Sequence, residues 1–307
     1  MSPSKRTLLV VVLAALALLA GPSGSYAEPA PNRWALVKSP AKGIASSMGE
    51  YSSGCLRGAA RLALDGIGYQ VMHPSRLRYY GSPDLVDFIR KLGQALHAEK
   101  LGDLMVGDLS QPRGGPAPGG HSSHQTGLDV DLWYWQPKAA ARGPLPTAER
   151  ESTKARSVLD GKAGTVRAEF APRVAALLRL TASDARVTRI FVHPIIKRML
   201  CADAESDRAW LSKVRPWYGH DDHFHVRLAC PAGDKQCIPQ TPVVAGDGCG
   251  ELDWWFSKDR QEDREKGQAT YQSKVGKAPG MPAQCAKLLE DVPASVPAPA
   301  ADGGATR

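Results

Sequence analysis

Two short segments hold five of the eight histidines in the 307-residue chain, and each has the pattern of a strand with one polar face. Over residues 126–135 and 223–228, apolar side chains alternate with polar ones, which is typical of a strand whose one face enters the core. His223 and His225 are two residues apart on the second strand, so their rings leave the same face of the sheet. A fold of this chain must therefore bring two imidazoles side by side.

An acidic residue and a further histidine stand near the first strand. Asp131 lies on its polar face, and His124 precedes Asp131 by seven residues, where a Gly/Pro-rich loop ends. If the two strands are neighbours, His124, Asp131 and one histidine of the later pair can converge. Two imidazoles and one carboxylate form a catalytic zinc set that leaves a fourth position for water.

The pattern leaves alternatives to this metal hypothesis. Alternation allows Asp129 in the place of Asp131, and a histidine-rich surface patch or a phosphate-binding cluster would contain the same residue types. The chain has no His-Glu-x-x-His segment, which excludes a thermolysin-like site.

The first thirty residues have the pattern of a targeting segment rather than of a folded element. Lys5 and Arg6 precede an apolar run from Leu8 to Ala20, and Ser25-Tyr26-Ala27 supplies small residues for cleavage. The run is shorter than the roughly 20 residues that a bilayer-spanning helix needs. We predict a secretory signal peptide over residues 1–27, with an uncleaved anchor as the alternative. The mature protein is expected in the periplasm, without stable membrane insertion.

Six cysteines follow this segment, and an even number in an exported chain predicts three disulfides, although the residues alone leave the pairing open. A cysteine-based zinc site is the alternative, but no two cysteines have the close spacing of zinc ribbons and fingers. The formal net charge of +8 suits an anionic polymer outside the membrane. Peptidoglycan stem peptides, with their carboxylates, are therefore a better partner than a nucleic acid.

Helices and short strands interleave without the regular spacing of βαβ units, which favours one α+β domain. We predict a central antiparallel sheet that carries the zinc site, flanked by helices and long loops, over residues 28–290. A Pro/Ala-rich tail over 291–307 is predicted to be disordered. The expected strands lie at 69–72, 104–108, 126–135, 187–192 and 223–228, and the expected helices at 84–99, 170–180, 195–201 and 209–214.

Two stretches carry a family resemblance: Ser123-His124-Gln125-Thr126-Gly127-Leu128-Asp129-Val130-Asp131 and His223-Phe224-His225-Val226-Arg227. They resemble the two signatures of the penicillin-insensitive murein endopeptidases. That family belongs to a wider group with the lysostaphin-type peptidases, the D-Ala-D-Ala metallopeptidases and the hedgehog signalling domain. The likeness extends through residues 190–194, 213–217 and 246–250, and covers about residues 32 to 290.

The resemblance implies a role for each matched residue. His124, Asp131 and His225 would be the ligands of a Zn²⁺ cofactor. His223 would be the general base or electrostatic partner, and His220 would assist it from the preceding loop.

The resemblance also implies the cysteine pairs Cys55–Cys285, Cys201–Cys249 and Cys230–Cys237. In relatives, a residue matching His121 and an Asp-Gly-Lys-His segment can supply contacts to an additional metal. Asp160 matches the start of that segment, but Ala163 stands where its histidine would be. A second metal site would therefore have only His121 and Asp160 in this chain.

The activity implied by the resemblance is hydrolysis of D-alanyl–meso-diaminopimelyl cross-links between stem peptides, without sensitivity to penicillin. Two alternatives remain at this point. A zinc D,D-carboxypeptidase would trim terminal D-alanine, but such enzymes commonly have Glu-x-x-His before the last ligand, where this chain has His-Asp-Asp-His-Phe-His. A non-catalytic zinc wall-binding module would not need the additional imidazoles of His220 and His223.

Overall fold

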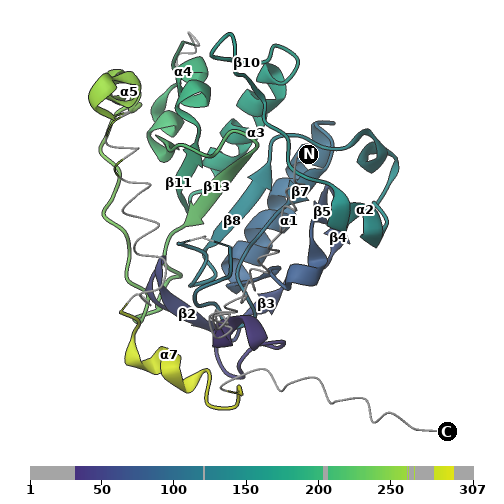
Figure 1. Ribbon diagram of the computed structural model, residues 1–307, viewed down its shortest axis with the longest axis vertical. Coiled ribbons are helices and arrows are strands. Elements are labelled where there is room, and N and C mark those ends of the chain that lie inside the picture. Colours follow the sequence, from purple (N-terminus) through teal and green to yellow (C-terminus); the bar gives the residue numbers. More distant parts are fainter. Residues whose placement is uncertain are drawn as a thin grey trace, which may run out of the picture. The chain divides into compact units, whose positions relative to one another are not determined.

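A seven-stranded mixed sheet carries both histidine segments. The computed structural model describes residues 32–119, 122–202, 207–260, 262, 266 and 280–293, and the strands around the site can be followed in Figure 1. The order across the sheet is β12 (Val214–Pro216), β11 (Val187–Val192), β13 (His223–Leu228), β8 (Asp129–Trp133), β7 (Leu104–Val106), β5 (Tyr69–Val71) and β4 (Asp65–Gly66). All five expected strands belong to this sheet.

The expectation of a purely antiparallel sheet is wrong in part. β5 and β7 run parallel, as do β11 and β12, whereas the other neighbouring pairs are antiparallel. In both parallel pairs a helix lies between the two strands in the sequence: α1 (Pro83–Ala98) follows β5, and α4 (Pro194–Ala202) follows β11. A helical crossover returns the chain to the same end of the sheet, so the next strand runs in the same direction as the first.

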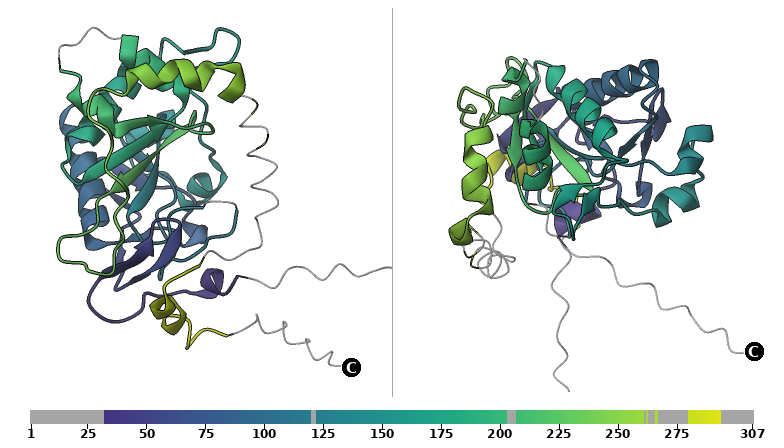
Figure 2. Two further views of the ribbon diagram at one scale, coloured as in Figure 1. Left: turned by 90° about the vertical axis from the view of Figure 1, so that its left-hand side faces the viewer. Right: turned by 90° about the horizontal axis from the view of Figure 1, so that it is seen from above.

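The amphipathic pattern at 84–99 forms α1. Ser82 caps this helix, because its hydroxyl accepts a hydrogen bond from the backbone N–H of Leu85 at 3.2 Å. Helices α1 and α3 (Ala171–Ser183) contribute their apolar faces to one core with the apolar side chains of β8 and β13, among them Val130, Leu132, Phe224 and Val226. Figure 2 shows α1, in blue, beside the strands. The opposite face of β8 and β13 is left for the polar residues.

The remaining elements are short. Paired strands β1 (Ser46–Glu50) and β2 (Ser53–Arg57), β3 (Ala60–Arg61) and β6 (Tyr80–Gly81), and β9 (Leu159–Asp160) and β10 (Thr165–Val166) lie outside the main sheet. Other helices with described bounds are α2 (Thr147–Ser152), α5 (Leu252–Phe256) and α7 (Ala283–Lys287), and the 3-10 turns with described bounds are η1 (Arg33–Leu36), η2 (Pro74–Arg76), η3 (Lys138–Arg142), η4 (Ala209–Lys213) and η5 (Cys249–Glu251). The helix expected at 209–214 is thus the 3-10 turn η4, followed directly by β12.

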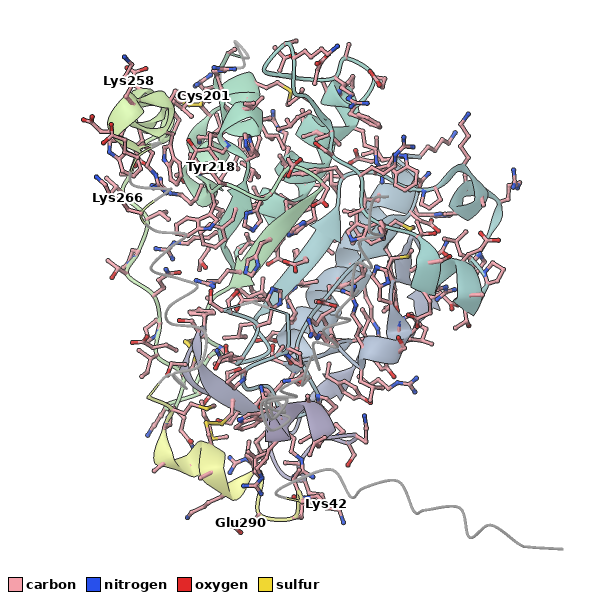
Figure 3. The ribbon with its side chains drawn as sticks, in the orientation of Figure 1. Lys42, Cys201, Tyr218, Lys258, Lys266 and Glu290 are labelled. Atoms are coloured by element: carbon pink, nitrogen blue, oxygen red, sulfur yellow. A yellow bond between two sulfur atoms is a disulfide. The ribbon has the colours of Figure 1, made fainter. Side chains whose placement is uncertain are left out.

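Three disulfides join the pairs that the resemblance implied: Cys55–Cys285, Cys201–Cys249 and Cys230–Cys237. The second of them fastens α4 to η5, and Cys201 is labelled in Figure 3. The described cysteines include no free thiol.

The ends of the described chain meet in a second apolar cluster, which contains Trp34, Met48, Cys55, Cys285 and Leu288 among its members. Val292 also packs there, and the guanidinium of Arg113 pairs with the Asp291 carboxylate. The fold therefore extends past residue 290, where the tail was expected to begin.

Replacing both Cys55 and Cys285 with alanine is expected to lower the free energy of unfolding by about 2–5 kcal/mol. The bond closes a sequence separation of 230 residues, and its loss releases that restraint in the unfolded chain. Urea unfolding of the mature protein, followed by circular dichroism, measures the change. The matched control replaces Cys230 and Cys237, which are 7 positions apart, and should lower the free energy of unfolding by a smaller amount. Equal losses from the two pairs would contradict an explanation by loop length.

Three expectations lie outside the described residues: the signal peptide over 1–27, the tail beyond residue 293, and His121. In the part of the chain that the structure describes, every helix is too short or too polar to cross a bilayer.

Candidate metal centre

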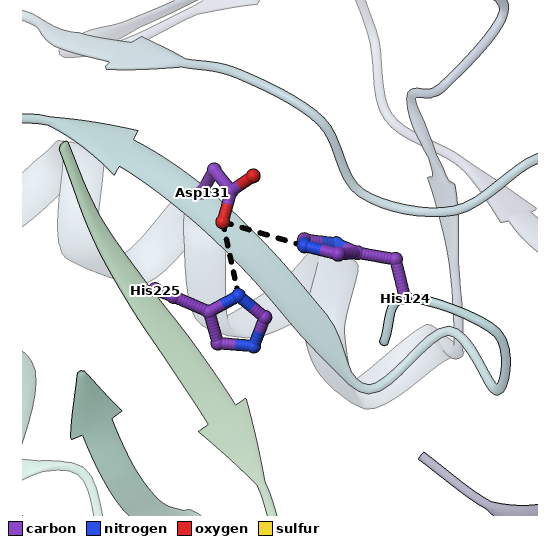
Figure 4. A group of neighbouring side chains, drawn as sticks. All are labelled: His124, Asp131 and His225. Atoms are coloured by element: carbon purple, nitrogen blue, oxygen red, sulfur yellow. Dashed lines mark hydrogen bonds and ion pairs between the residues drawn. The ribbon is translucent and has the colours of Figure 1, made fainter. Parts of the chain in front are cut away.

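The pairing of β8 with β13 brings a carboxylate and an imidazole together. These strands are antiparallel neighbours, and His225 lies directly opposite Asp131. Directly opposite residues in such a pair project from the same face of the sheet. Nδ1 of His225 is 3.0 Å from Oδ1 of Asp131, as the dashed line in Figure 4 marks.

His124 reaches the same carboxylate from the turn that precedes β8. Its Nε2 is 3.3 Å from Oδ1 of Asp131, and its ring centroid is 4.6 Å from that of His225. The backbone of His124 has φ of 67°, in the left-handed region that residues other than glycine rarely adopt. Gly127, at φ of 70°, completes the turn. A side chain at this position would place its Cβ only 2.4 Å from Cδ2 of Leu56. The turn thus depends on tight local packing.

These three residues form a group that could hold a metal ion. One donor atom from each of His124, Asp131 and His225 lies within 4.8 Å of the other two, and all three residues are buried. Two imidazole nitrogens and one carboxylate oxygen are the donor set of a catalytic zinc site with an open position. The residues that are present therefore fit the metal that the resemblance implies.

The charge state of Asp131 suits a ligand. Burial alone would raise the pKa of this carboxyl, but the neighbouring His124 and His223 outweigh burial and hold the pKa well below its ordinary value. Asp131 is therefore a carboxylate at neutral pH, which is the form that binds a cation.

Two further histidines stand beside the group. Nε2 of His223 is 3.9 Å from Oδ1 of Asp131, and its Nδ1 contacts Oδ1 of Asp222 at 2.5 Å. The ring of His220 lies 5.1 Å from that of His223 and 6.1 Å from that of His225, measured between centroids. Four of the five clustered histidines are thus within one neighbourhood.

Their surroundings push the pKa values of His220 and His223 apart. Burial, together with the nearby His223 and His225, lowers the pKa of His220 to about 3. Burial also acts to lower the pKa of His223, but Asp131 and the hydrogen bond to Asp222 outweigh it, and the pKa is raised. At neutral pH His220 is therefore neutral, whereas His223 is the better proton acceptor.

A comparison with known protein families shows to which family the chain belongs. The family model described as penicillin-insensitive murein endopeptidase matches residues 47–290, which include all four of these histidines and Asp131. The chain belongs to this family.

Relatives in the penicillin-insensitive murein endopeptidase family match over nearly their whole length. A protein of that name from Klebsiella pneumoniae (strain 342) is 43% identical over 281 residues, which are 91% of this chain and 97% of the relative. One from Salmonella arizonae is 42% identical over 269 residues, covering 87% and 94%. One from Yersinia enterocolitica is 40% identical over 265 residues, covering 84% and 90%.

Of the two residues considered for a second metal, the structure describes Asp160, which hydrogen-bonds within its own turn. Oδ1 of Asp160 accepts hydrogen bonds from the backbone N–H groups of Lys162 and Ala163, at 3.0 and 3.1 Å. These bonds lower the pKa of Asp160 and engage its carboxylate within its own turn. Among the described residues, the set of His124, Asp131 and His225 is the group that could hold an ion, and His121 lies outside them.

Three polar residues beside the site carry contacts that the sequence did not assign. Asp222 contacts His223, and Asp129 and Arg227 form an ion pair next to His225. The sequence shows Asp222 within the segment His-Asp-Asp-His. A turn has no period that predicts which of the two aspartates contacts a histidine. Asp129 was considered only as a substitute for Asp131. Strand alternation puts both aspartates on one face and says nothing about which atoms they contact.

Proposed function

We propose that this chain is a zinc-dependent murein endopeptidase that hydrolyses D-alanyl–meso-diaminopimelyl cross-links between stem peptides and is insensitive to penicillin. The observation that carries the proposal is the approach of His124, Asp131 and His225, whose donor atoms lie within 4.8 Å of one another. It occurs in a chain whose family and relatives are named for murein endopeptidase activity. The mature enzyme would act in the periplasm, where its polymeric substrate lies, after removal of residues 1–27.

His124, Asp131 and His225 would hold the metal. When bound there, zinc would polarise the scissile carbonyl and bring the pKa of a water molecule toward neutrality. The enclosure of these residues excludes bulk solvent and strengthens electrostatic interactions with the substrate.

His223 is proposed to move the proton. Asp222 accepts the Nδ1–H of His223 and leaves Nε2 on the side of Asp131. Nε2 can therefore take a proton from the attacking water and release it to the leaving amine. Because His220 remains neutral, it can contribute a hydrogen bond without adding a charge. A serine nucleophile has no part in this scheme, so penicillin, which acylates such a serine, would find no target.

Digestion of purified sacculi tests the proposal. The mature protein with one equivalent of zinc should convert cross-linked muropeptide dimers to monomers, as measured by liquid chromatography and mass spectrometry, and benzylpenicillin should not change the rate. Removal of the metal with a chelator should stop the reaction, and added zinc should restore it.

The products separate the proposal from its alternatives. Release of free D-alanine from pentapeptide stems, with the dimers intact, would identify a carboxypeptidase. Zinc binding without any new product would identify a wall-binding module, and full activity after verified metal removal would refute zinc dependence. N-terminal sequencing of the exported protein tests cleavage after Ala27.

A further inference from the structure

One carboxylate outside the candidate ligand set contacts two of its members. Asp129 is fully buried, with no exposed surface. Its Oδ1 lies 2.8 Å from Nε2 of His225, and its Oδ2 accepts a hydrogen bond from the backbone N–H of His124 at 3.2 Å. Asp129 therefore connects the strand that carries His225 to the turn that carries His124.

A buried arginine holds this carboxylate in place. Nε of Arg227 donates to Oδ1 of Asp129 at 2.7 Å. Arg227 is fixed in turn, since its Nη1 donates to Oε1 of Gln240 at 2.8 Å and its guanidinium lies 4.3 Å from the ring centroid of Tyr51 and 5.3 Å from that of Phe191. Asp129 thus receives three donors, from Arg227, His225 and His124, in a pocket with no exposed edge.

The contacts of Asp129 determine which nitrogen of His225 carries the proton. A carboxylate paired with a guanidinium can only accept hydrogen bonds, so Nε2 of His225 must be the donor. In the neutral ring, Nδ1 then presents its lone pair toward Oδ1 of Asp131, 3.0 Å away. Two acceptors facing each other at this distance repel unless a cation lies between them. Asp129 therefore prepares Nδ1 as the atom that binds an ion.

His124 needs a similar restraint. Its backbone adopts a left-handed conformation that an L-residue disfavours. The hydrogen bond from its N–H to Asp129 supports that conformation and helps to place the side chain, whose Nε2 is 3.3 Å from Asp131.

We infer that Asp129, fixed by Arg227, is a positioning residue that orients both imidazole ligands and so sets the metal affinity of the site. This inference rests on the metal set of the proposed function, but it concerns binding and does not depend on which bond the enzyme cuts. Carboxylates that accept the second N–H of a histidine ligand commonly contribute 10–100-fold to metal affinity.

The test is the zinc affinity of Asp129→Asn, measured with metal-free protein by competition with a chromophoric chelator. An amide has the same shape as the carboxylate but must direct its NH₂ group at one of the three donors. We expect zinc binding about 10–100-fold weaker than in the unmodified protein. The matched control is Asp184→Asn, which makes the same change at a carboxylate that pairs with Arg186 at the end of α3, and its zinc affinity should stay within about twofold.

A spectroscopic measurement separates positioning from a general loss of stability. With saturating Co²⁺ in place of zinc, the visible absorption bands should shift or change intensity in Asp129→Asn and remain unchanged in Asp184→Asn, because these bands report ligand geometry. Unchanged zinc affinity together with an unchanged cobalt spectrum in Asp129→Asn would overturn the inference. So would equal losses of zinc affinity in the two variants.

A second variant covers the case in which Asp129→Asn does not fold. Arg227→Lys keeps the cation but lacks the rigid fork that holds Asp129 and contacts Gln240. Its zinc affinity should fall several-fold, and an affinity equal to that of the unmodified protein would refute the positioning role. If the unmodified protein itself binds no zinc, the proposed function fails at its metal set. If it binds zinc normally and these variants do too, only this inference fails.

Discussion

Replacing Asp131 with alanine is expected to remove the bound metal and to lower the turnover of cross-linked muropeptides by about a thousandfold or more. Its Oδ1 contacts both candidate imidazole ligands, at 3.3 Å from Nε2 of His124 and 3.0 Å from Nδ1 of His225. Without this carboxylate, two neutral rings would remain to bind a dication. The loss follows because polarisation of a carbonyl by a metal is worth several kcal/mol, and each 1.36 kcal/mol is a tenfold change in rate.

Metal content by atomic emission spectroscopy and turnover of purified dimeric muropeptides measure the two effects of the Asp131 change. The control is Asp184→Ala, which removes an aspartate that pairs with Arg186 at the end of α3. That variant should keep one zinc per chain and its activity. If Asp131→Ala retains stoichiometric zinc, Asp131 is not a ligand and the proposed centre is incorrect.

Replacing His223 with alanine is expected to reduce turnover by about 10²–10⁴-fold while zinc remains bound. The ring lies near the candidate centre, since Nε2 is 3.9 Å from Oδ1 of Asp131, but it is not one of the three grouped donors. Its contribution would be proton transfer, for which Asp222 orients the ring. The same substitution at His225 should lose metal and activity together, because that ring supplies one of the grouped donors.

The separation of activity from metal content is the decisive measurement for His223. Turnover and zinc stoichiometry are determined on the same preparations of His223→Ala, His225→Ala and His97→Ala. His97 lies exposed on α1, so its replacement should leave both quantities close to those of the unmodified protein. Zinc loss from His223→Ala as complete as that from His225→Ala would show that His223 is a ligand and not a proton carrier.

Local sequence patterns predicted the elements that carry the site. Alternation over 223–228 places His223 and His225 on one face of β13, because successive side chains of a strand point to opposite sides. The helix expected at 84–99 is α1, and the structure adds its cap at Ser82. These predictions hold since the periods of strands and helices are properties of neighbouring residues.

Local sequence patterns could not predict whether neighbouring strands run parallel or antiparallel. β5 and β7 are parallel because α1 lies between them, and their pairing joins residues such as Tyr69 and Leu104. Because the short strands are irregularly spaced along the sequence, the two helical crossovers could not be inferred from it. Chain reversal and sheet order depend on packing between distant segments, which no local period records.

The sequence by itself determined that two imidazoles of one strand share a face and that a histidine and two aspartates stand near another strand. Alternation alone left the two aspartates equivalent, and the different contacts that they make come from the tertiary structure. The register of β8 against β13 places Asp131 opposite His225 and Asp129 opposite Arg227, so the first can join the metal group while the second pairs with a guanidinium. The physical reason is that alternation fixes the face of a side chain, whereas its partners depend on which residue of another strand lies across from it.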